Sequence, residues 1–287
     1  MFFLLFLCLN RKKEKMMGLT SMQIINTSKG SVNVQVSGHG GKALVLIHGN
    51  SSSHLSFSKL IKEKILLENY TFYCIDLPGH GKSNHFEKNN YNLEFMACVV
   101  QEVITALDLQ KFDLLGHSLG GHIALRVAAK VKPQNLILVQ CSPGKDLGEV
   151  ATFFQPLPQS QYLYVENPNS NEVTSLFTAL TNSKDEKGLL AQDFQKTDPA
   201  FRSGLSESLG SAVFANELDI LENLNKAGVQ TTLVISRFDQ FLKTDEIMQK
   251  WSGSELLNYL ETKAEGHYAH FADFSTWFQT FKELMVK

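Results

Sequence analysis

The chain has 287 residues, of which 43% are hydrophobic, and a formal net charge of −2 at neutral pH. A chain of this length can bury most of its apolar surface in one large domain or in two modest ones. Its nearly balanced charge gives no electrostatic basis for binding nucleic acid or an anionic membrane surface. We therefore expect no nucleic-acid partner and no stable membrane insertion, and the sequence leaves the oligomeric state open.

Residues 1–22 are interpreted as a leader that does not belong to the folded domain. The apolar run from Phe2 to Leu9 is too short to cross a bilayer, which requires about 20 residues. The positive charges at 11–15 follow this run, whereas a secretory signal places its positive charges first. We therefore predict that 1–22 is disordered or wrongly included, rather than a signal peptide or an anchor.

From residue 32 to residue 141 the sequence alternates expected strands and helices. Strands are expected at 32–36, 43–47, 71–75, 112–115 and 135–141, and helices at 55–67, 93–107 and from 119 onward. The unbroken apolar run Ala43–Ile47 is typical of a central strand covered on both faces. Asn92 is the expected N-cap of the second helix. The alternation predicts an α/β fold with a mostly parallel sheet and right-handed crossovers.

The alternation stops between residues 145 and 214. This segment is rich in aromatic residues, is interrupted by prolines, and lacks the strand patterns of its flanks. Because a loop of this length without secondary structure is rare in a compact domain, we expect a mainly helical cap at 145–214. The core is then formed by 23–144 and 215–287. Its second part contains expected strands at 231–236 and 256–260 and a helix after residue 270.

The cysteines are Cys8, Cys74, Cys98 and Cys141, and their spacing matches no metal-ligand pattern. Cys74 and Cys141 fall in expected buried strands and Cys98 on an expected amphipathic helix. We therefore interpret them as small apolar core residues. Unpaired thiols are typical of a reducing compartment, which favours a cytoplasmic location. No metal and no cofactor are predicted.

A sharp turn is expected from Gly116 to Gly120, where the sequence reads G-H-S-L-G between a strand and a helix. Side chains at the two glycine positions would collide across such a turn. The turn presents the hydroxyl of Ser118 above the helix N-terminus, where unpaired N–H groups favour negative charge. The pattern therefore predicts Ser118 as a nucleophile.

A serine hydroxyl needs a base to take its proton, a carboxylate to orient that base, and donors for the oxyanion. Asp239 follows the expected strand 231–236, and His267 follows the next expected strand. Loops at the carboxyl ends of parallel strands meet at one edge of the sheet. We therefore predict that Ser118, His267 and Asp239 act as nucleophile, base and orienting acid.

Other residues compete for two of these roles. His270 is the reserve base, although we expect it to open the terminal helix. Asp239 lies nearer to its strand end than the competing acids, which are Asp219, Asp245 and Glu246. His122, on the serine helix, is interpreted as a partly buried packing residue.

The oxyanion donors are expected at two backbone positions. The N–H of Leu119 lies at the helix start, and the N–H of Asn50 lies in the turn after the first central strand. His48 is expected to brace this turn by hydrogen bonding rather than to transfer protons. The serines at 51–53 are interpreted as solvating and capping residues of the loop.

These motifs resemble the α/β-hydrolase superfamily over residues 24–284. The matching segments are 46–49 (L-I-H-G), 76–83 (D-L-P-G-H-G-K-S), 116–121 (G-H-S-L-G-G), Asp239, and 266–267 (G-H). The resemblance implies the α/β-hydrolase fold, with helices on both sides of the sheet and an inserted cap. It also implies that the order Ser, Asp, His is that of a catalytic triad.

Two shorter segments resemble a narrower group, the α/β-hydrolases that open N-acyl-homoserine lactones. They are 47–53 (I-H-G-N-S-S-S) and 120–123 (G-G-H-I). In these relatives the acid lies in a corresponding arginine-containing loop, which falls on Asp239, and a cap covers an acyl-chain pocket. The resemblance implies that the chain opens such lactones.

The sequence thus predicts a serine hydrolase that cleaves a carboxylic ester or lactone with an apolar acyl group through an acyl-enzyme. The substrate is a small molecule. Aromatic residues of the cap are candidate substrate contacts, namely Phe153, Phe154, Tyr162 and Tyr164. Three alternatives stay open: a carbon–carbon bond hydrolase, a thioesterase, and a ligand-binding member without activity.

Overall fold

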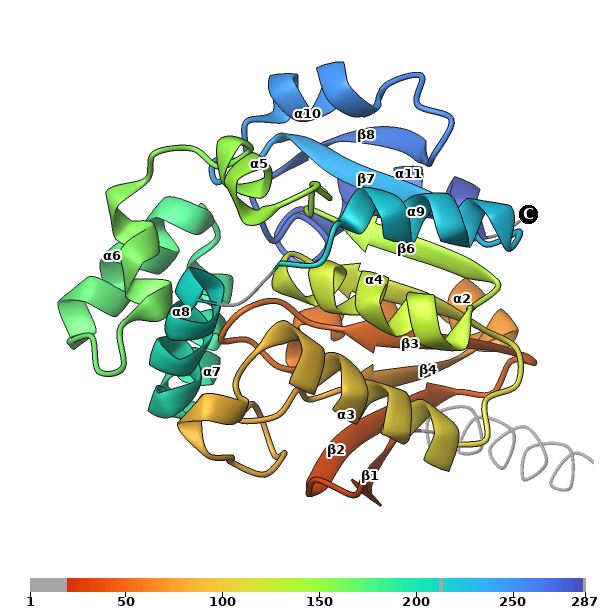
Figure 1. Cartoon of the computed structure of the whole chain (residues 1–287), viewed down its shortest axis with the longest axis horizontal. Helices are drawn as coiled ribbons and strands as arrows, with labels where there is room; N and C mark the ends of the chain where they lie inside the picture. The colour runs from red at the N-terminus through yellow and green to blue at the C-terminus, as the bar shows by residue number, and fades with distance from the viewer. Residues whose placement is uncertain (1–19, 212–213, 286–287) are drawn as a thin grey trace, which may run out of the picture.

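A mostly parallel sheet of eight strands lies between two layers of helices in the computed structural model, which describes residues 20–211 and 214–285 (Figure 1). The strands are β1 (Thr20–Asn26), β2 (Ser31–Gly38), β3 (Lys42–Ile47), β4 (Tyr70–Ile75), β5 (Phe112–His117), β6 (Asn135–Val139), β7 (Gln230–Phe238) and β8 (Asn258–Glu265). Their order is β1-β2-β4-β3-β5-β6-β7-β8. Pairs that involve β2 are antiparallel and all others are parallel. The predicted α/β fold is confirmed.

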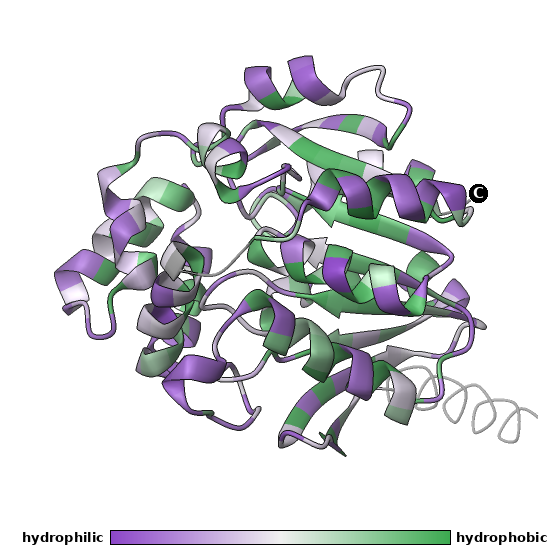
Figure 2. Cartoon of the chain, viewed as in Figure 1, coloured by the Kyte–Doolittle hydropathy of each residue, from purple (hydrophilic) through white to green (hydrophobic). Residues whose placement is uncertain are grey.

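Helices cover both faces of the sheet. One layer contains α3 (Leu93–Ala106), α4 (Leu119–Val131) and α9 (Glu217–Lys226), and the other contains α2 (Lys64–Asn69) and α11 (Phe274–Met285) (Figure 1). Hydrophobic residues line the strands and the inner helix faces (Figure 2). Asn92 caps α3 as predicted, because its side chain accepts from the N–H of Phe95 at 2.8 Å.

Between β6 and β7 the chain forms helices at one end of the sheet (Figure 1). They are α5 (Leu147–Thr152), η4 (Pro158–Tyr164), α6 (Ser170–Leu180), α7 (Lys184–Lys196) and α8 (Pro199–Ser211). Buried hydrogen bonds attach them to the core, from Ser53 Oγ to Asp193 at 2.6 Å and from Tyr91 Oη to Asp198 at 2.5 Å. Phe201 of α8 also packs in the main core cluster. The boundaries of a cap at 145–214 and a core at 23–144 and 215–287 stay predictions.

Several element boundaries differ from those expected. Residues 20–22, assigned to the leader, belong to β1, which pairs with β2; the rest of the leader, 1–19, lies outside the described residues. The helix expected at 55–67 is broken into η1 (His54–Phe57), η2 (Leu60–Lys62) and α2. Glu63, with ψ at 112°, is extended and separates η2 from α2. The last strand lies at 258–265 rather than 256–260. Within the described ranges, no helix is both long and apolar enough to cross a membrane.

Buried histidines make the stability of this fold depend on pH. Burial lowers the pKa of His48 to about 4 and, together with the neighbouring His267, that of His270 to about 3. Burial also holds the pKa values of His80 and His117 well below 6.5. These imidazoles are therefore neutral in the folded chain, whereas the unfolded chain protonates them below about pH 6.5.

We expect the contribution of these four histidines to the free energy of unfolding to be retained above pH 6.5 and to fall as the pH decreases toward 4. The slope is up to about 1.4 kcal/mol per pH unit for each histidine. Urea denaturation at several pH values measures it. His270→Phe should reduce the slope, because it removes one of these histidines. It should break no hydrogen bond, because neither nitrogen of this ring has a partner among the described residues. The exposed His39→Gln is the control, and an unchanged slope in His270→Phe would contradict the account.

Candidate active site

The turn between β5 and α4 holds Ser118 in a strained conformation, with φ at 52° and ψ at −121°. Its N–H donates to the carbonyl of Val139 at 2.8 Å, which ties the turn to β6. A Cβ atom at Gly116 would lie 2.2 Å from the carbonyl oxygen of Gly120. One at Gly120 would lie 2.5 Å from the carbonyl oxygen of Ile47 on β3. Glycine at both positions therefore lets the chain make this turn.

The three side chains predicted to act together are brought into one hydrogen-bonded series. His267 Nε2 lies 2.9 Å from Ser118 Oγ, and His267 Nδ1 lies 2.8 Å from Asp239 Oδ2. Asp239 follows β7 and His267 follows β8, so both come from loops at the carboxyl edge of the sheet. Both residues are buried, His267 at 2% and Asp239 at 6% exposure. This arrangement can remove a proton from the serine hydroxyl.

The Asp239 carboxylate is fixed by further donors. Its Oδ1 accepts from the backbone N–H groups of Phe241 at 2.7 Å and Leu242 at 3.2 Å. Its Oδ2 accepts from Gln140 Nε2 at 2.7 Å, and Gln140 Oε1 accepts from the N–H of Ser236 at 2.6 Å. These donors stabilise the negative charge and set its orientation. Sequence analysis missed Gln140, and no local signal marks it except its place at a strand end.

His117, the residue before the serine, was also missed. Burial lowers its pKa well below 6.5, with the neighbouring His270 and His267 acting in the same direction. The ring is therefore neutral, and its Nε2 donates to the carbonyl oxygen of His267 at 2.9 Å. This hydrogen bond holds the backbone of His267 against the serine turn.

The two residues predicted to supply oxyanion donors, Asn50 and Leu119, line a cavity together with Ser118. The side chain of Asn50 is directed toward η4, with Nδ2 3.5 Å from the carbonyl oxygen of Leu163. His48 braces the loop, since Nδ1 lies 2.8 Å from the carbonyl oxygen of Gly49 and Nε2 accepts from Leu77.

Other residues proposed from the sequence lie elsewhere. His270 does not open α11; it is buried against Phe57, Trp277 and His117. The serines at 51–53 are buried, so a solvating role for them is wrong. Ser53 does cap η1 by accepting from the N–H of Leu55.

The cavity at Ser118, called here the inner cavity, has a volume of about 80 Å³ and a mostly apolar lining. Of the cap aromatics named as candidates, Phe154 and Tyr164 line it. The other two do not: Phe153 packs in the main core, and Tyr162 packs against a separate cluster of cap residues. Alternation and spacing do not show which face of a cap helix is turned inward, so the sequence could not separate the two pairs.

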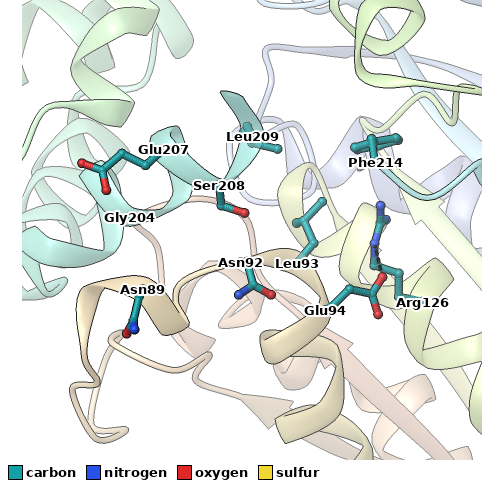
Figure 3. Close-up of a pocket in the computed structure, with 10 residues that line it drawn as sticks. All are labelled: Asn89, Asn92, Leu93, Glu94, Arg126, Gly204, Glu207, Ser208, Leu209 and Phe214. Atoms are coloured by element: carbon teal, nitrogen blue, oxygen red, sulfur yellow. Dashed lines mark ion pairs between the residues drawn. The ribbon is translucent and has the colours of Figure 1, made fainter. Parts of the chain in front are cut away.

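A larger outer cavity of about 480 Å³ adjoins the inner one. Its lining residues come from the start of α3 and the turn before it, from α4, from α8, and from Phe214 before α9 (Figure 3). Leu93, Leu209 and Phe214 line both cavities and therefore form the wall between them. Within the described ranges no group of acidic, histidine or cysteine side chains could hold a metal ion.

A mostly parallel sheet with a serine turn after β5, an acid after β7 and a histidine after β8 defines an α/β hydrolase. The family model described as alpha/beta hydrolase fold matches residues 42–274. The chain belongs to this family.

Comparison with single proteins agrees with the family assignment. An uncharacterized hydrolase of Bacillus subtilis, YugF, is 34% identical over 107 residues, which cover 37% of this chain and 38% of that protein. A serine hydrolase-like protein of Danio rerio is 33% identical over 85 residues, 29% of this chain and 26% of that protein. The chain thus matches less than half the length of these curated relatives.

A solved structure is similar over much more of the chain. It is a mutant of the N-acyl homoserine lactonase AidH in complex with N-hexanoyl homoserine lactone. The TM-score is 0.79 at 25% sequence identity, and the match covers 92% of this chain and 97% of that chain. The resemblance to a lactonase seen in the sequence extends to the whole fold.

The close approach at Gly120 gives a testable prediction. Gly120→Ala should lower the free energy of unfolding by about 1–3 kcal/mol or more, because its Cβ meets backbone atoms that cannot move aside. Gly188→Ala is the matched control in α7, where a Cβ meets nothing within 4 Å. That control should gain up to about 1 kcal/mol from helix propensity. Chemical denaturation measures both, and equal effects would refute the steric account.

Proposed function

We propose that the chain is a serine hydrolase that cleaves a carboxylic ester or lactone with an apolar acyl group through an acyl-enzyme. The observation that carries the proposal is the hydrogen-bonded series from Ser118 Oγ through His267 to Asp239, at 2.9 Å and 2.8 Å. The apolar lining of the inner cavity supports the apolar acyl group.

In the proposed reaction, Ser118 attacks the carbonyl carbon while His267 Nε2 takes the hydroxyl proton. Asp239 holds the proton on Nδ1 and stabilises the imidazolium. The oxyanion is received by the N–H groups of Leu119 and Asn50, each of which typically contributes about 10²–10³ in rate. His267 then protonates the leaving alcohol, and water hydrolyses the acyl-enzyme through the same histidine.

We further propose that the substrates are N-acyl homoserine lactones. Two observations support this choice: the loop from residue 47 to residue 53, and the similarity to AidH over 92% of the chain. In a lactone the alcohol released from the carbonyl stays attached to the acyl-enzyme. The site must therefore deliver water to the acyl-enzyme before the ring closes again, and His267 is the base in reach of that water.

Asp239→Asn should lower kcat/KM by about three to four orders of magnitude, because the amide leaves His267 in the wrong tautomer. The matched control is Asp245→Asn, a competing acid in the sequence. Asp245 is exposed and pairs with Arg237 at 2.6 Å, away from the triad. Hydrolysis of a chromogenic ester measures both variants. A comparable loss in the control would remove Asp239 from its proposed role.

A substrate panel tests the reaction class. Purified chain at neutral pH should open N-butanoyl and N-hexanoyl homoserine lactones, and a fluorophosphonate should label Ser118. Ser118→Ala supplies the background, because these lactones also open spontaneously in base. Hydrolysis of p-nitrophenyl esters with intact lactones would end the lactonase proposal. Preferential cleavage of acyl thioesters or vinylogous diketones would favour the thioesterase or carbon–carbon hydrolase instead.

A further inference from the structure

An arginine side chain that the proposed reaction does not use lines the outer cavity. Arg126, on α4, is buried at 3% exposure, and its Cζ lies 4.7 Å from the ring centre of Phe214, one of the three wall residues (Figure 3). Its Nη1 donates to the carbonyl oxygen of His122 at 2.8 Å. His122 lies one turn of the helix beyond Ser118, or about 6 Å further along its axis. A ligand held at Ser118 can therefore reach Arg126 with a group several atoms beyond its reacting carbonyl.

The Nη1 side of this guanidinium is fixed inside the protein. Nη1 also donates to Glu217 at 2.7 Å, and Glu217 is fully buried at the start of α9. The same carboxylate accepts from the N–H of Gly144 at 3.2 Å and lies 2.8 Å and 3.0 Å from Nδ1 of His122. His122 is thus part of a hydrogen-bonded cluster and not the packing residue expected from the sequence. Glu217 holds the arginine in place from behind.

The opposite edge of the guanidinium, formed by Nε and Nη2, has an incomplete partner. Nε lies 3.1 Å from the carboxylate of Glu94, but it makes no hydrogen bond to any described residue. The side chain of Glu94 is 58% exposed and lies 3.7 Å from Lys130 Nζ, so a second cation is close to it. Because an ion pair with such an exposed carboxylate contributes little free energy, a ligand can displace Glu94 at small cost.

The charges around the outer cavity leave Arg126 available to an anion. Glu207 also lines the cavity, but it lies 2.7 Å from Lys88 Nζ and is paired there. Glu217 is shared between Arg126 and His122, both of which can carry positive charge. Once Glu94 has turned to Lys130, the free edge of the guanidinium faces no carboxylate of the lining. A carboxylate is the group that fits this edge, because its two oxygens match the planar fork of Nε and Nη2.

We propose that the outer cavity is a carboxylate subsite, and that the chain hydrolyses half-esters of medium-length dicarboxylic acids besides the lactones. The ester carbonyl lies at Ser118, the methylene chain passes the three apolar wall residues, and the terminal carboxylate binds the free edge of Arg126. The ester bond is cleaved by the acyl transfer proposed for Ser118, on which this inference rests. The substrate is then apolar in its middle, where the lining is apolar, and charged at its far end.

Two matched esters test the subsite on the full chain. Mono-p-nitrophenyl suberate ends in a carboxylate, and p-nitrophenyl octanoate has the same chain length and ends in a methyl group. The measured quantity is the KM for the suberate divided by the KM for the octanoate. Glu94→Gln should lower this ratio by about 2- to 5-fold, because the competing carboxylate is removed. An unchanged or higher ratio in this exposed, conservative variant would overturn the proposal.

Two further variants frame that result. Arg126→Lys, with folding checked by circular dichroism, should raise the ratio by about 10-fold or more, because an ammonium group lacks the planar fork. Glu68→Gln is the matched control, since it removes the same charge from an exposed position on α2, in the helix layer on the other side of the sheet. It should leave the ratio unchanged, and an equal shift in this control would refute a local effect of Glu94.

Binding is separated from catalysis in Ser118→Ala protein. By isothermal titration calorimetry, monomethyl suberate should bind at least about 10-fold more tightly than dimethyl suberate, which carries neutral ester oxygens at both ends. Equal affinities would refute the subsite, even where octanoate hydrolysis supports the proposed function. Tighter binding of the half-ester together with no ester hydrolysis by the wild type would support the subsite and contradict the acyl transfer.

Discussion

The contact between helix α4 and the end of strand β3 is the constraint on which the site depends. A Cβ at Gly120 would come within 2.4 Å of the carbonyl oxygen of His48 and 2.5 Å of that of Ile47. Only glycine lets the helix start this close to the sheet, directly after Ser118 with its positive φ. The loop that α4 touches carries Asn50. This steric contact therefore brings Ser118 and Leu119, at the start of α4, close to the loop that carries Asn50.

The acid and the base depend on a second set of cross-links. Asp239 and His267 lie on separate loops, and neither loop has regular structure to hold it. Gln140 joins the end of β6 to β7 and to Asp239, while His117 binds the backbone of His267. Each loop is thus held in part by a side chain from another strand or from the residue that follows it, and the loop of Asp239 also by its own backbone N–H groups. Fixed donors of this kind need no rearrangement during reaction, which is what electrostatic stabilisation requires.

Much of this architecture is predictable because it rests on local patterns. Apolar runs predicted the central strands, and the glycines around Ser118 predicted the turn. The positions of Asp239 and His267 after expected strands identified them as candidates. Contacts between residues far apart in the sequence could not be predicted. Gln140 acts through contacts about 100 residues away in sequence, at |i−j| of 99 and 96. Glu217 meets His122 across 95 residues, and no period or spacing marks such a pair.

In the segment 145–214, predicted to be a cap, the sequence likewise did not show which side chains reach the cavity. The segment is rich in aromatic residues, but only Phe154 and Tyr164 of the four candidates line the inner cavity. The sequence indicated the chemistry of the segment but not which side of each helix meets the core. Likewise, the sequence at 55–67 predicts one helix, but the extended backbone of Glu63 interrupts it, and β4 begins soon afterwards at Tyr70.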